Sequence, residues 1–404
     1  MRKAVCIALL ISLILGTNVS TIAARRQTKS QVRAQTKAKS KASVRSKPKP
    51  KPRETFVPYQ ACILVEADTG QILYEEGAHK KWPPASMAKM MLTLIVVEKV
   101  KEGSIKLTDF VTVSEQASKI GGSQVHLKVS EVFTLEELIK AVLIVSANDA
   151  ATAVAEYVAG SVEGFIQLMN ERAKALKMND TQYFNVHGLP LPADQQGNVS
   201  TAFDTAILAR ELLKYSDVLR WTSTHQTKFR NDTLTLTNTN RLIGNFPGAD
   251  GLKTGYISKS GFNLTATALR DDMRLIAVVM GGASSRIRFQ EAANLLSTGF
   301  DTYQKFVVLK KDQPFGQALP VKKGNRRSIR PIMAEDAVVV IKKGAEKGIS
   351  LQPNLPALIE APINKGQEVG KVSVQLANCT LATFPLVAPE DVPKHWFWRL
   401  FDFK

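Results

Sequence analysis

The chain has 404 residues, 44% of them hydrophobic, which is enough to form two folded domains with full-sized cores. Its formal charge of +18 would suit a nucleic-acid-binding protein, but residues 1–53 hold fourteen of the cations and no acidic residue, so residues 54–404 carry only +4. We therefore exclude a strongly basic nucleic-acid-binding domain. The chain has neither a Cys/His cluster with metal-ligand spacing nor a glycine-rich phosphate loop, so we expect no metal and no cofactor.

Residues 1–24 have the pattern of a secretory signal peptide. Arg2 and Lys3 precede an apolar run over residues 4–15, and small residues follow as a cleavage site. Because the run is too short to span a bilayer, we expect an exported protein, in the periplasm or on the extracytoplasmic face of the cytoplasmic membrane. An uncleaved membrane anchor is the alternative.

Residues 25–54 form a basic, Lys/Pro-rich stretch with few apolar side chains. Such a segment cannot bury enough surface to fold and repels itself, so it predicts a disordered tether, extended at its proline-rich end. After export its partners would be anionic wall polymers or lipid head groups, held by charge. A passive linker is the alternative.

The folded part is expected to begin with a hairpin over residues 61–74 and a helix that starts near Ala85. The hairpin has two apolar runs around a turn, and two prolines before Ala85 suit a helix entry. Ser86 then lies in the first helical turn, with Lys89 one turn along the same face, so the pair offers a nucleophile and a base. By itself the pair is a weak signal, because the tether contains the same Ser-x-x-Lys spacing.

A second group of polar residues lies at a predicted corner between two helices. Thr134 and Glu137 form a capping box that begins one helix. This helix ends at Ser146-Ala147-Asn148, and another follows over residues 149–158. At such a corner the Ser146 hydroxyl and the Asn148 carboxamide can point together into a cleft. A plain helix cap at Asn148 is the alternative.

The next stretch predicts two helices, a loop and an exposed strand. Amphipathic spacing gives a helix over residues 165–176, and Ser200 is expected to cap a helix that runs to Lys214. His187 lies in the loop between them, where we expect a structural role. Residues 221–240 alternate polar and apolar side chains, as an exposed strand does.

The Lys253-Thr254-Gly255 motif follows on a predicted strand. It supplies a cation, a hydroxyl and a residue without a side chain, so that an extended peptide can lie along the strand edge. An ordinary strand with a solvated lysine is the alternative. A hairpin over residues 264–280 and a helix over residues 286–296 complete this part.

The rest of the chain predicts a small all-β domain and an amphipathic tail. Short apolar runs separated by Gly and Pro predict strands at residues 306–309, 337–341, 355–359 and 372–376. As a helix, residues 390–404 place most of their aromatic side chains on one face, which suits a membrane interface, and they are too short to cross a bilayer. Packing of this tail onto the β-domain is the alternative.

The three motifs occur in the order Ser86-x-x-Lys89, Ser146-x-Asn148, Lys253-Thr254-Gly255. Together they resemble the set found in low-molecular-mass penicillin-binding proteins of the serine-type D-alanyl-D-alanine carboxypeptidase family. The resemblance implies an α+β fold. A serine β-lactamase/transpeptidase-like domain, with an antiparallel sheet and a helical subdomain, would span residues 55–304, and the small all-β domain would span residues 305–389.

The resemblance also implies roles for the catalytic residues. Ser86 would be the acylated nucleophile and Lys89 the base that takes its proton, while Ser146 and Asn148 would relay the proton and hold the substrate amide. To act near neutral pH, Lys89 must be uncharged, so its pKa must fall from about 10.4 to near 7. Burial and the nearby charge of Lys253 would both lower it.

The implied substrate-binding residues are Lys253, Thr254, Gly255, Tyr256 and Arg288. Backbone N–H groups of Ser86 and Tyr256 would form the oxyanion hole, and Thr254 with Arg288 would bind the free carboxylate of the substrate. Arg286 is the alternative to Arg288.

The function that the resemblance implies is serine-type D-Ala-D-Ala carboxypeptidase activity in cell-wall biosynthesis and remodelling. Such an enzyme removes the terminal D-alanine from peptidoglycan pentapeptide stems through an acyl-enzyme and is acylated by penicillin and other β-lactam antibiotics. Alternatives are a D,D-endopeptidase that cuts peptide crosslinks and a weakly active β-lactam-binding wall module. A β-lactamase is disfavoured, because no Glu-x-x-x-Asn loop lies in the roughly 40 residues after Ser146.

Overall fold

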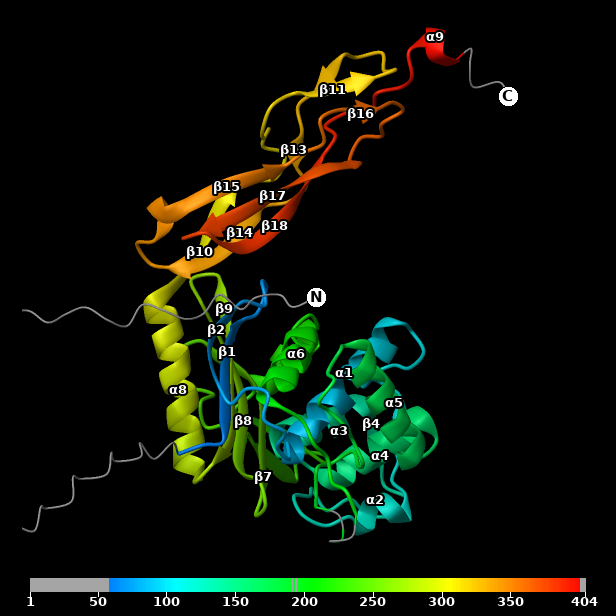
Figure 1. Cartoon of the computed structure of the whole chain (residues 1–404). Helices are drawn as coiled ribbons and strands as arrows, with labels where there is room; N and C mark the ends of the chain where they lie inside the picture. Colours follow the sequence, from blue (N-terminus) through cyan, green and yellow to red (C-terminus); the bar gives the residue numbers. More distant parts are fainter. Residues whose placement is uncertain (1–57, 191, 193–194, 400–404) are drawn as a thin grey trace, which may run out of the picture. The chain divides into compact units, whose positions relative to one another are not determined.

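The computed structural model describes residues 58–190, 192 and 195–399. The predicted signal peptide over residues 1–24 and the predicted tether over residues 25–54 lie outside this part of the chain, as do the last five residues of the tail. The described residues confirm the predicted fold class, an α+β domain followed by a small β domain (Figure 1).

The first domain is built on a five-stranded antiparallel sheet with the strand order β2-β1-β9-β8-β7. Its strands are β1 (Ala61–Glu66), β2 (Ile72–Glu76), β7 (Ala249–Ile257), β8 (Gly261–Arg270) and β9 (Met273–Gly282). The β1–β2 and β8–β9 pairs confirm the two predicted hairpins. Strand β7, which carries the Lys-Thr-Gly motif, lies at the end of the order, so its outer edge can pair with another extended chain.

The two faces of the sheet are buried by different helices. Along β1, Cys62 and Leu64 pack with α8 (Ser285–Thr302), whereas Ile63 belongs to the core shared with the other helices. Helix α6 (Ala202–Leu212) contacts β1 and β9 on this second face (Figure 1). Successive side chains of a strand point to opposite faces of the sheet. Because helices cover both faces, β1 is apolar at almost every position.

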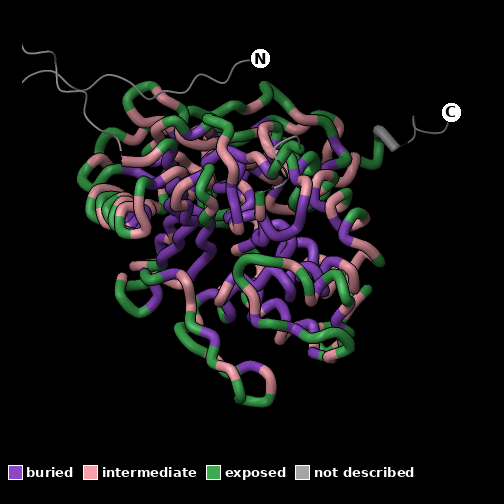
Figure 2. The backbone as a smooth tube through the Cα atoms, turned by 90° about the horizontal axis from the view of Figure 1, so that it is seen from below, coloured by how far each residue is buried: buried purple, intermediate pink, exposed green. Residues whose placement is uncertain are grey.

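Most of the remaining helices lie around α1 (Lys89–Lys101), which is buried along its N-terminal two-thirds. Every residue from Lys89 to Val97 is buried, and Figure 2 shows the buried backbone gathered in the interior. The other helices are η1 (Ala85–Ala88), α2 (Glu115–Lys119), α3 (Leu135–Ile144), α4 (Asn148–Ala159), α5 (Val162–Ala175) and α7 (Ser216–Thr222). A helix that is covered on all sides carries apolar side chains around its whole circumference. Lys89, the first residue of this helix, therefore already lies inside the core.

Helix boundaries differ from the predicted ones by a few residues. Helix α6 is capped by Thr201 and not by Ser200, because the Thr201 hydroxyl accepts a hydrogen bond from the Asp204 amide at 2.9 Å. The Ser200 backbone is already paired with Trp82 in an isolated β-bridge, so the helix starts one residue later. Helix α8 continues to Thr302 instead of ending near residue 296.

The exposed strand predicted at residues 221–240 is confirmed only in part, in two short strands. Trp221 is buried in α7, and a short hairpin of β5 (Gln226–Phe229) and β6 (Leu234–Thr237) follows. Burial of the large Trp221 ring outweighs the local alternation of polar and apolar residues on which the prediction relied.

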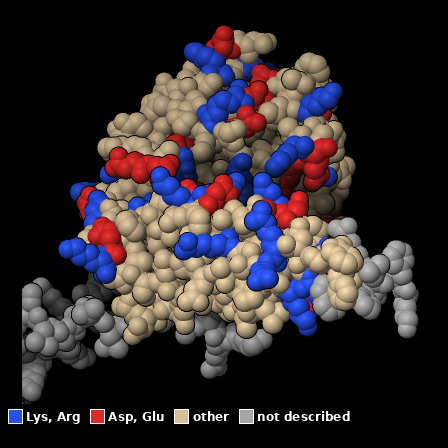
Figure 3. Space-filling view, turned by 90° about the horizontal axis from the view of Figure 1, so that it is seen from above, with Lys and Arg blue, Asp and Glu red and all other residues tan. Residues whose placement is uncertain are grey.

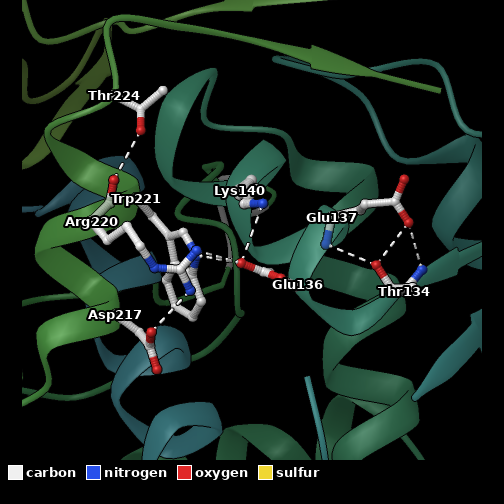
Figure 4. Close-up of polar contacts among 8 residues, drawn as sticks. All are labelled: Thr134, Glu136, Glu137, Lys140, Asp217, Arg220, Trp221 and Thr224. Carbon is white, nitrogen blue, oxygen red and sulfur yellow. Dashed lines mark hydrogen bonds and ion pairs between the residues drawn. The ribbon is translucent and has the colours of Figure 1, made fainter. Parts of the chain in front are cut away.

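The capping box predicted at the start of α3 is confirmed (Figure 4). The Thr134 hydroxyl accepts a hydrogen bond from the Glu137 amide at 3.3 Å, and the Glu137 carboxylate accepts one from the Thr134 amide at 2.9 Å. A second short hairpin, β3 (Phe110–Thr112) with β4 (Val132–Thr134), leads into this cap.

Glu136, in the same turn, joins α3 to α7 (Figure 4). Its Oε1 accepts hydrogen bonds from Arg220 Nη1 at 2.9 Å and from Trp221 Nε1 at 3.0 Å, and Lys140 Nζ lies 3.2 Å away. One half-buried carboxylate therefore satisfies the indole N–H of the buried tryptophan and holds two helices together.

The second domain is built from short strands. They are β10 (Tyr303–Leu309), β11 (Leu319–Lys322), β12 (Ser328–Ile329), β13 (Ile332–Met333), β14 (Ala337–Lys342), β15 (Ile349–Asn354), β16 (Ile359–Glu360), β17 (Glu368–Leu376) and β18 (Cys379–Val387), with one helical turn, η2 (Glu346–Gly348). Three of the four predicted strands are confirmed in β10, β14 and β17. The strand predicted at residues 355–359 is wrong: Leu355 packs into the core from a loop, and only Ile359 enters a strand.

The described chain ends in a short helix, α9 (Trp396–Arg399). Trp396 is 66% exposed and Phe397 is 46% exposed. Among the described residues, no helix has the length and apolar character needed to cross a bilayer. Acidic and basic side chains are interspersed on the face seen in Figure 3, as expected from the small net charge of residues 54–404.

We expect Glu136→Gln to lower the free energy of unfolding by about 1–2 kcal/mol at neutral pH. Burial raises the pKa of Glu136, but hydrogen bonds from Trp221, Lys140 and Arg220 outweigh burial, and the pKa lies below its ordinary 4.5. The charged form is therefore favoured by folding, so the stabilisation is present above the unfolded-state pKa and is lost as the pH falls through the folded-state value. Urea unfolding at about pH 7 and about pH 3 measures this difference.

Glu115→Gln is the matched control, because Glu115 pairs only with Lys119 on the exposed surface of α2. Exposed pairs of this kind contribute about 0–1 kcal/mol. A loss for Glu136→Gln that is no larger than that of the control, or that stays the same at low pH, would contradict the assigned role of Glu136.

Candidate active site

Ser86 is held at a sharp entry into the buried helix α1. Pro84 precedes the 3-10 turn η1, and Ala85 adopts a positive φ of 50°, which is uncommon for a residue with a side chain. Ser86 follows in this turn, and Lys89 is the first residue of α1. The predicted spacing is confirmed, because Lys89 Nζ lies 3.0 Å from Ser86 Oγ.

The Lys89 amine has three polar partners and no contact with solvent. Nζ donates to Asn148 Oδ1 at 2.6 Å and to the His187 carbonyl oxygen at 2.9 Å, and its third partner is the Ser86 hydroxyl. A neutral amine has two N–H groups and one lone pair. In the structure Nζ donates to Ser86 Oγ, and the Ser86 hydroxyl in turn donates to the His187 carbonyl oxygen at 3.3 Å. When the amine is neutral and its two N–H groups are held by the carboxamide and carbonyl oxygens, its lone pair faces Ser86.

The surroundings of Lys89 favour this neutral form. Burial, followed by the charge of Lys253, holds the pKa of Lys89 well below its usual 10.5, and Asp149 opposes them only in part. The Asp149 carboxylate is engaged elsewhere, since it accepts hydrogen bonds from the backbone amides of Val125 and Leu127. The direction and both causes agree with the sequence-based expectation for Lys89.

Ser146 and Asn148 lie at the predicted corner between α3 and α4. Ser146 has a positive φ of 66°, and its Oγ is buried without a hydrogen-bond partner among the described residues. Asn148 is the first residue of α4 and does not cap it, so the plain-cap alternative is wrong. Its side chain bridges Lys89 and the Gly121 carbonyl oxygen, to which Nδ2 donates at 2.7 Å.

Strand β7 brings the third motif against the turn that holds Ser86. A Cβ on Gly255 would lie 2.6 Å from the Pro84 carbonyl oxygen, so only glycine allows this close approach. Lys253 is fully buried, and its Nζ donates to the Thr254 carbonyl oxygen at 3.1 Å. Burial and then the charge of Arg288 lower the pKa of Lys253 to about 7. The Thr254 hydroxyl donates to the Thr239 hydroxyl at 2.8 Å.

Arg288 is the arginine that faces the motif. It is buried on α8, where Nη1 donates to the carbonyl oxygens of Gly255 at 3.1 Å and Asn263 at 3.2 Å. Its Nε has no partner among the described residues. Burial and then the charge of Arg241 lower the pKa of Arg288 to about 10. Arg286 is exposed instead, so the structure favours Arg288 over the alternative.

Tyr256 follows the Lys-Thr-Gly motif on β7 and directs its side chain to the surface. The ring is 52% exposed and stacks on Phe262, with the two ring centroids 4.3 Å apart. In sum, the structure places Ser86, Lys89 and Asn148 in direct contact, with the Lys253-Thr254-Gly255 strand alongside. The Ser146 hydroxyl makes no hydrogen bond within the described chain.

Sequence analysis did not identify the backbone carbonyl of His187 as part of the site. The His187 carbonyl oxygen accepts a hydrogen bond from Lys89, while the His187 ring accepts one from the Leu189 amide through Nδ1. Asn185 fixes this turn, because its Oδ1 accepts from the Gly188 amide at 2.6 Å and its Nδ2 donates to the Leu189 carbonyl oxygen. An Asn three residues before a Gly marks a tight turn, which was the available signal.

No cofactor is suggested by the side chains of the site. In the parts of the chain that the structure describes, no group of three or more His, Cys, Asp or Glu side chains is placed to hold a metal ion. The site consists instead of a hydroxyl, two buried amines with lowered pKa values, a carboxamide and backbone carbonyl groups. Such a set suits nucleophilic catalysis through the serine hydroxyl with an amine as the base.

Two family profiles together match most of the chain. The profile described as D-alanyl-D-alanine carboxypeptidase matches residues 49–284. The profile described as penicillin-binding protein 5, C-terminal domain, matches residues 303–394.

Similar proteins include both a curated enzyme and solved structures. The chain is 38% identical over 346 residues to the D-alanyl-D-alanine carboxypeptidase DacF of Bacillus subtilis, which covers 84% of this chain and 87% of that protein. Penicillin binding protein 5 from Haemophilus influenzae superimposes with a TM-score of 0.76 at 30% identity, covering 84% of this chain and 98% of that one. Penicillin-binding protein D2 from Listeria monocytogenes, in its ampicillin-bound form, gives a TM-score of 0.56 at 28% identity and covers 61% of this chain and 98% of that one.

We expect Lys253→Met to raise the melting temperature, and to raise it more at about pH 6 than at about pH 10. The pKa of Lys253 is about 7 in the folded protein and 10.5 ordinarily, so between these values the unfolded chain binds more protons and stability rises with pH. Below about pH 7 the wild type carries the full cost of a buried charge, roughly 4–5 kcal/mol at about 1.36 kcal/mol per pKa unit. Methionine has no such cost, and thermal unfolding at both pH values measures the difference.

Lys228→Met, on the exposed surface of β5, is the control and should change neither value. An advantage of Lys253→Met that is the same at both pH values would show that packing, and not the buried charge, is responsible.

Proposed function

This chain belongs to the D-alanyl-D-alanine carboxypeptidase family, and we propose that it removes the terminal D-alanine from peptidoglycan pentapeptide stems through an acyl-enzyme on Ser86. The observation that carries this proposal is the environment of Lys89. Its two N–H groups have fixed acceptors and its pKa is lowered, so its lone pair is available to the hydroxyl 3.0 Å away. A neutral base beside a serine is the requirement of acyl transfer.

In the acylation step, Ser86 Oγ attacks the carbonyl carbon of the penultimate D-alanine while its proton passes to Lys89 Nζ. The oxygen of the resulting tetrahedral intermediate takes the negative charge and accepts hydrogen bonds from the backbone N–H groups of Ser86 and Tyr256. Collapse of this intermediate breaks the peptide bond. The departing amine needs a proton, which Lys89 returns through the Ser146 hydroxyl, a buried group that has no hydrogen-bond partner among the described residues.

In the deacylation step the same proton transfers occur with water as the nucleophile. Lys89, neutral again, takes a proton from the water that attacks the ester carbonyl. The same proton passes to Ser86 Oγ as the ester bond breaks. The shortened stem leaves as a carboxylic acid, which gives the second proton of the water to solvent and becomes a carboxylate. The enzyme returns to its starting state, with Lys89 neutral and Ser86 protonated.

The stem is proposed to bind as an extended chain along the free edge of β7. Gly255 allows β7 to lie directly against the turn of Ser86, which brings this free edge next to the nucleophile. The terminal carboxylate is assigned to the Thr254 hydroxyl and to Arg288, whose Nε has no partner within the described chain. The Asn148 amide has a second N–H for the substrate carbonyl. Recognition of a free carboxylate accounts for removal of the last residue only.

β-Lactam antibiotics are proposed to acylate the same serine. The Listeria relative is described in an ampicillin-bound form, and a β-lactam carries a reactive amide and a carboxylate, the two groups that Ser86 and Arg288 would meet. The resulting ester should persist, because among the described residues no carboxylate hydrogen-bonds to Ser86 or Lys89 to activate water more strongly than the amine does.

The protein is proposed to act outside the cytoplasm, with residues 390–404 lying in the membrane interface. The support is the predicted signal peptide over residues 1–24, together with the exposed Trp396 and Phe397 of α9. An amphipathic segment with exposed aromatic residues partitions into the interface without spanning the bilayer.

We expect Ser86→Ala to abolish covalent labelling by a fluorescent penicillin and to reduce D-alanine release from a pentapeptide by at least about 10³-fold. The substitution removes the nucleophile and leaves the two fixed acceptors of Lys89 in place. Gel fluorescence and a D-alanine assay measure the two effects. Ser118→Ala, which removes an exposed hydroxyl on α2, should be labelled as the wild type is. Labelling of a folded Ser86→Ala variant would rule out the assignment.

For the tail, we expect the double variant Trp396→Ser, Phe397→Ser to lose most of its binding to phosphatidylcholine vesicles. Uncharged vesicles are chosen so that the basic residues 25–54 do not contribute through charge. Co-sedimentation of the exported chain measures binding. The control is Phe110→Ser, because Phe110 is 73% exposed but lies on β3. If the double variant still sediments with the vesicles, the tail is not the anchor.

A further inference from the structure

The end of the second domain that carries α9 has a small core of its own. Strand β11 pairs with β12 on one side and with β16 on the other. The buried side chains beneath them are Leu319, Ile329, Ile363, Val369, Ala388 and Val392. Figure 1 shows β11, β16 and α9 at the same end of this domain. We call the unit formed by residues 319–330, 359–366 and 388–395 the tip.

The tip holds as much net positive charge as the whole of residues 54–404. It contains seven cations and three carboxylates, so its net charge is +4, the value for residues 54–404 together. The cations are Lys322, Lys323, Arg326, Arg327, Arg330, Lys365 and Lys394, and the carboxylates are Glu360, Glu390 and Asp391. Residues 396–404, which follow the tip, add two further cations and one acidic residue. The positive charge of the folded part is therefore concentrated beside the tail.

The three carboxylates of the tip are already engaged within it. Glu360 accepts a hydrogen bond from Lys323 Nζ at 2.5 Å, and a Glu390 oxygen lies 2.9 Å from Arg326 Nη2. The carboxylate of Asp391 accepts a hydrogen bond from a backbone amide of the tip at 2.7 Å. These contacts leave the other cations of the tip without an acidic partner in this unit.

Four cations of the tip are exposed and make no ion pair within the described chain. They are Lys322, Arg327, Arg330 and Lys365. Arg330 donates through Nε to a backbone carbonyl oxygen at 3.2 Å. The side chains of the other three have no hydrogen-bond partner among the described residues. Such cations can bind an external anion without breaking an internal contact.

Backbone hydrogen bonds hold the loop between β11 and β12 against the residues that precede α9. The His395 amide donates to the Lys323 carbonyl oxygen at 2.8 Å, and the Asn325 amide donates to the Pro393 carbonyl oxygen at 3.0 Å. Trp396 follows His395 directly, and consecutive Cα atoms are about 3.8 Å apart. The basic loop and the start of α9 therefore lie within about one Debye length, roughly 8 Å at physiological ionic strength.

The neighbouring aromatic side chains indicate which kind of anion the tip binds. Cations alone would suit any polyanion, but Trp396 and Phe397 are exposed beside them. Aromatic rings of this kind partition into the boundary between lipid headgroups and acyl chains. A soluble anionic polymer offers no such apolar region, whereas a membrane with anionic lipids offers both an apolar boundary and negative charge.

We propose that the tip is a docking surface for anionic phospholipid headgroups, bound by Lys322, Arg327 and Lys365; this rests on the proposed membrane location. The two parts act differently. The aromatic tail has affinity for any bilayer, whereas the tip adds a preference for anionic lipid. Because backbone hydrogen bonds fix the loop of the tip to the start of the tail, joint binding also sets the orientation of this domain on the membrane.

Co-sedimentation of the exported chain with two kinds of vesicle tests the proposal. One kind contains phosphatidylcholine only, and the other also contains about one third phosphatidylglycerol, which is anionic. The tip variant is Lys322→Gln, Arg327→Gln, Lys365→Gln, which removes three charges and no hydrogen bond within the described chain.

The matched control is Lys128→Gln, Lys174→Gln, Lys228→Gln. It removes the same number of charges from exposed positions in the first domain, none of which forms an ion pair within the described chain. Residues 25–54 are the same in both variants and in the wild type, so their attraction to anionic lipid does not contribute to the difference.

The expected result is a fall of roughly 10- to 100-fold in the apparent affinity of the tip variant for the phosphatidylglycerol vesicles. Its affinity for pure phosphatidylcholine should change less than about twofold, because the tail is intact. The control should lose less than about threefold on either kind of vesicle, since its charges lie away from the tip. Added salt at about 0.5 M should remove most of the difference between the tip variant and the wild type.

The proposal is overturned if the tip variant binds phosphatidylglycerol vesicles as the wild type does, or loses no more affinity than the control. An equal loss on both kinds of vesicle also contradicts it, because the effect would then not depend on lipid charge. Soluble poly(glycerol phosphate) is the third ligand. If the tip variant loses binding to this polymer but not to the vesicles, the tip binds a wall polymer and the proposal fails.

Failure of the proposed membrane location would look different. In that case the wild type would not sediment with phosphatidylcholine vesicles, whatever the tip variant does on anionic ones. Release of D-alanine from a soluble pentapeptide at the wild-type rate shows that the tip variant is folded.

Discussion

The proposed active site depends on keeping one amine, Lys89, inside the protein core. Burial of a charged ammonium group is unfavourable, so the pKa of Lys89 is lowered and the neutral amine is favoured. Two fixed acceptors, Asn148 and the His187 carbonyl, hold the amine in place. Because both acceptors take N–H groups, the lone pair is left toward Ser86. The burial and the hydrogen bonds of Lys89 therefore together set how well it can act as a base.

The three elements that surround this amine meet because two glycines permit close contact. Gly188 brings the loop of the His187 carbonyl against Ala85, and Gly255 brings β7 against Pro84. In both cases a side chain would overlap backbone atoms of the turn that holds Ser86. The edge position of β7 then leaves one side of this strand free to pair with an extended chain.

Local patterns predicted much of the fold. The capping box at Thr134 and Glu137, the two hairpins of the main sheet and the apolar helix after Ser86 are set by residues close together in the sequence, so their signals survive without tertiary information. The incorrect predictions concern segments whose structure depends on contacts with residues far away in the sequence. Trp221 lies in a helix, where its ring is buried and its indole N–H donates to the carboxylate of Glu136 on another helix. Leu355 packs against the core from a loop.

The sequence by itself determined which chemical groups the site contains and in what order: Ser86 with Lys89, Ser146 with Asn148, and the Lys253-Thr254-Gly255 strand. Their identities and spacings are local properties, and the resemblance to a known family rests on them. Only the tertiary structure decided which acceptors hold Lys89 and that Arg288 rather than Arg286 faces the strand. The reason is physical: a backbone carbonyl has no signature in the sequence, and the depth of a buried charge is set by segments far apart along the chain.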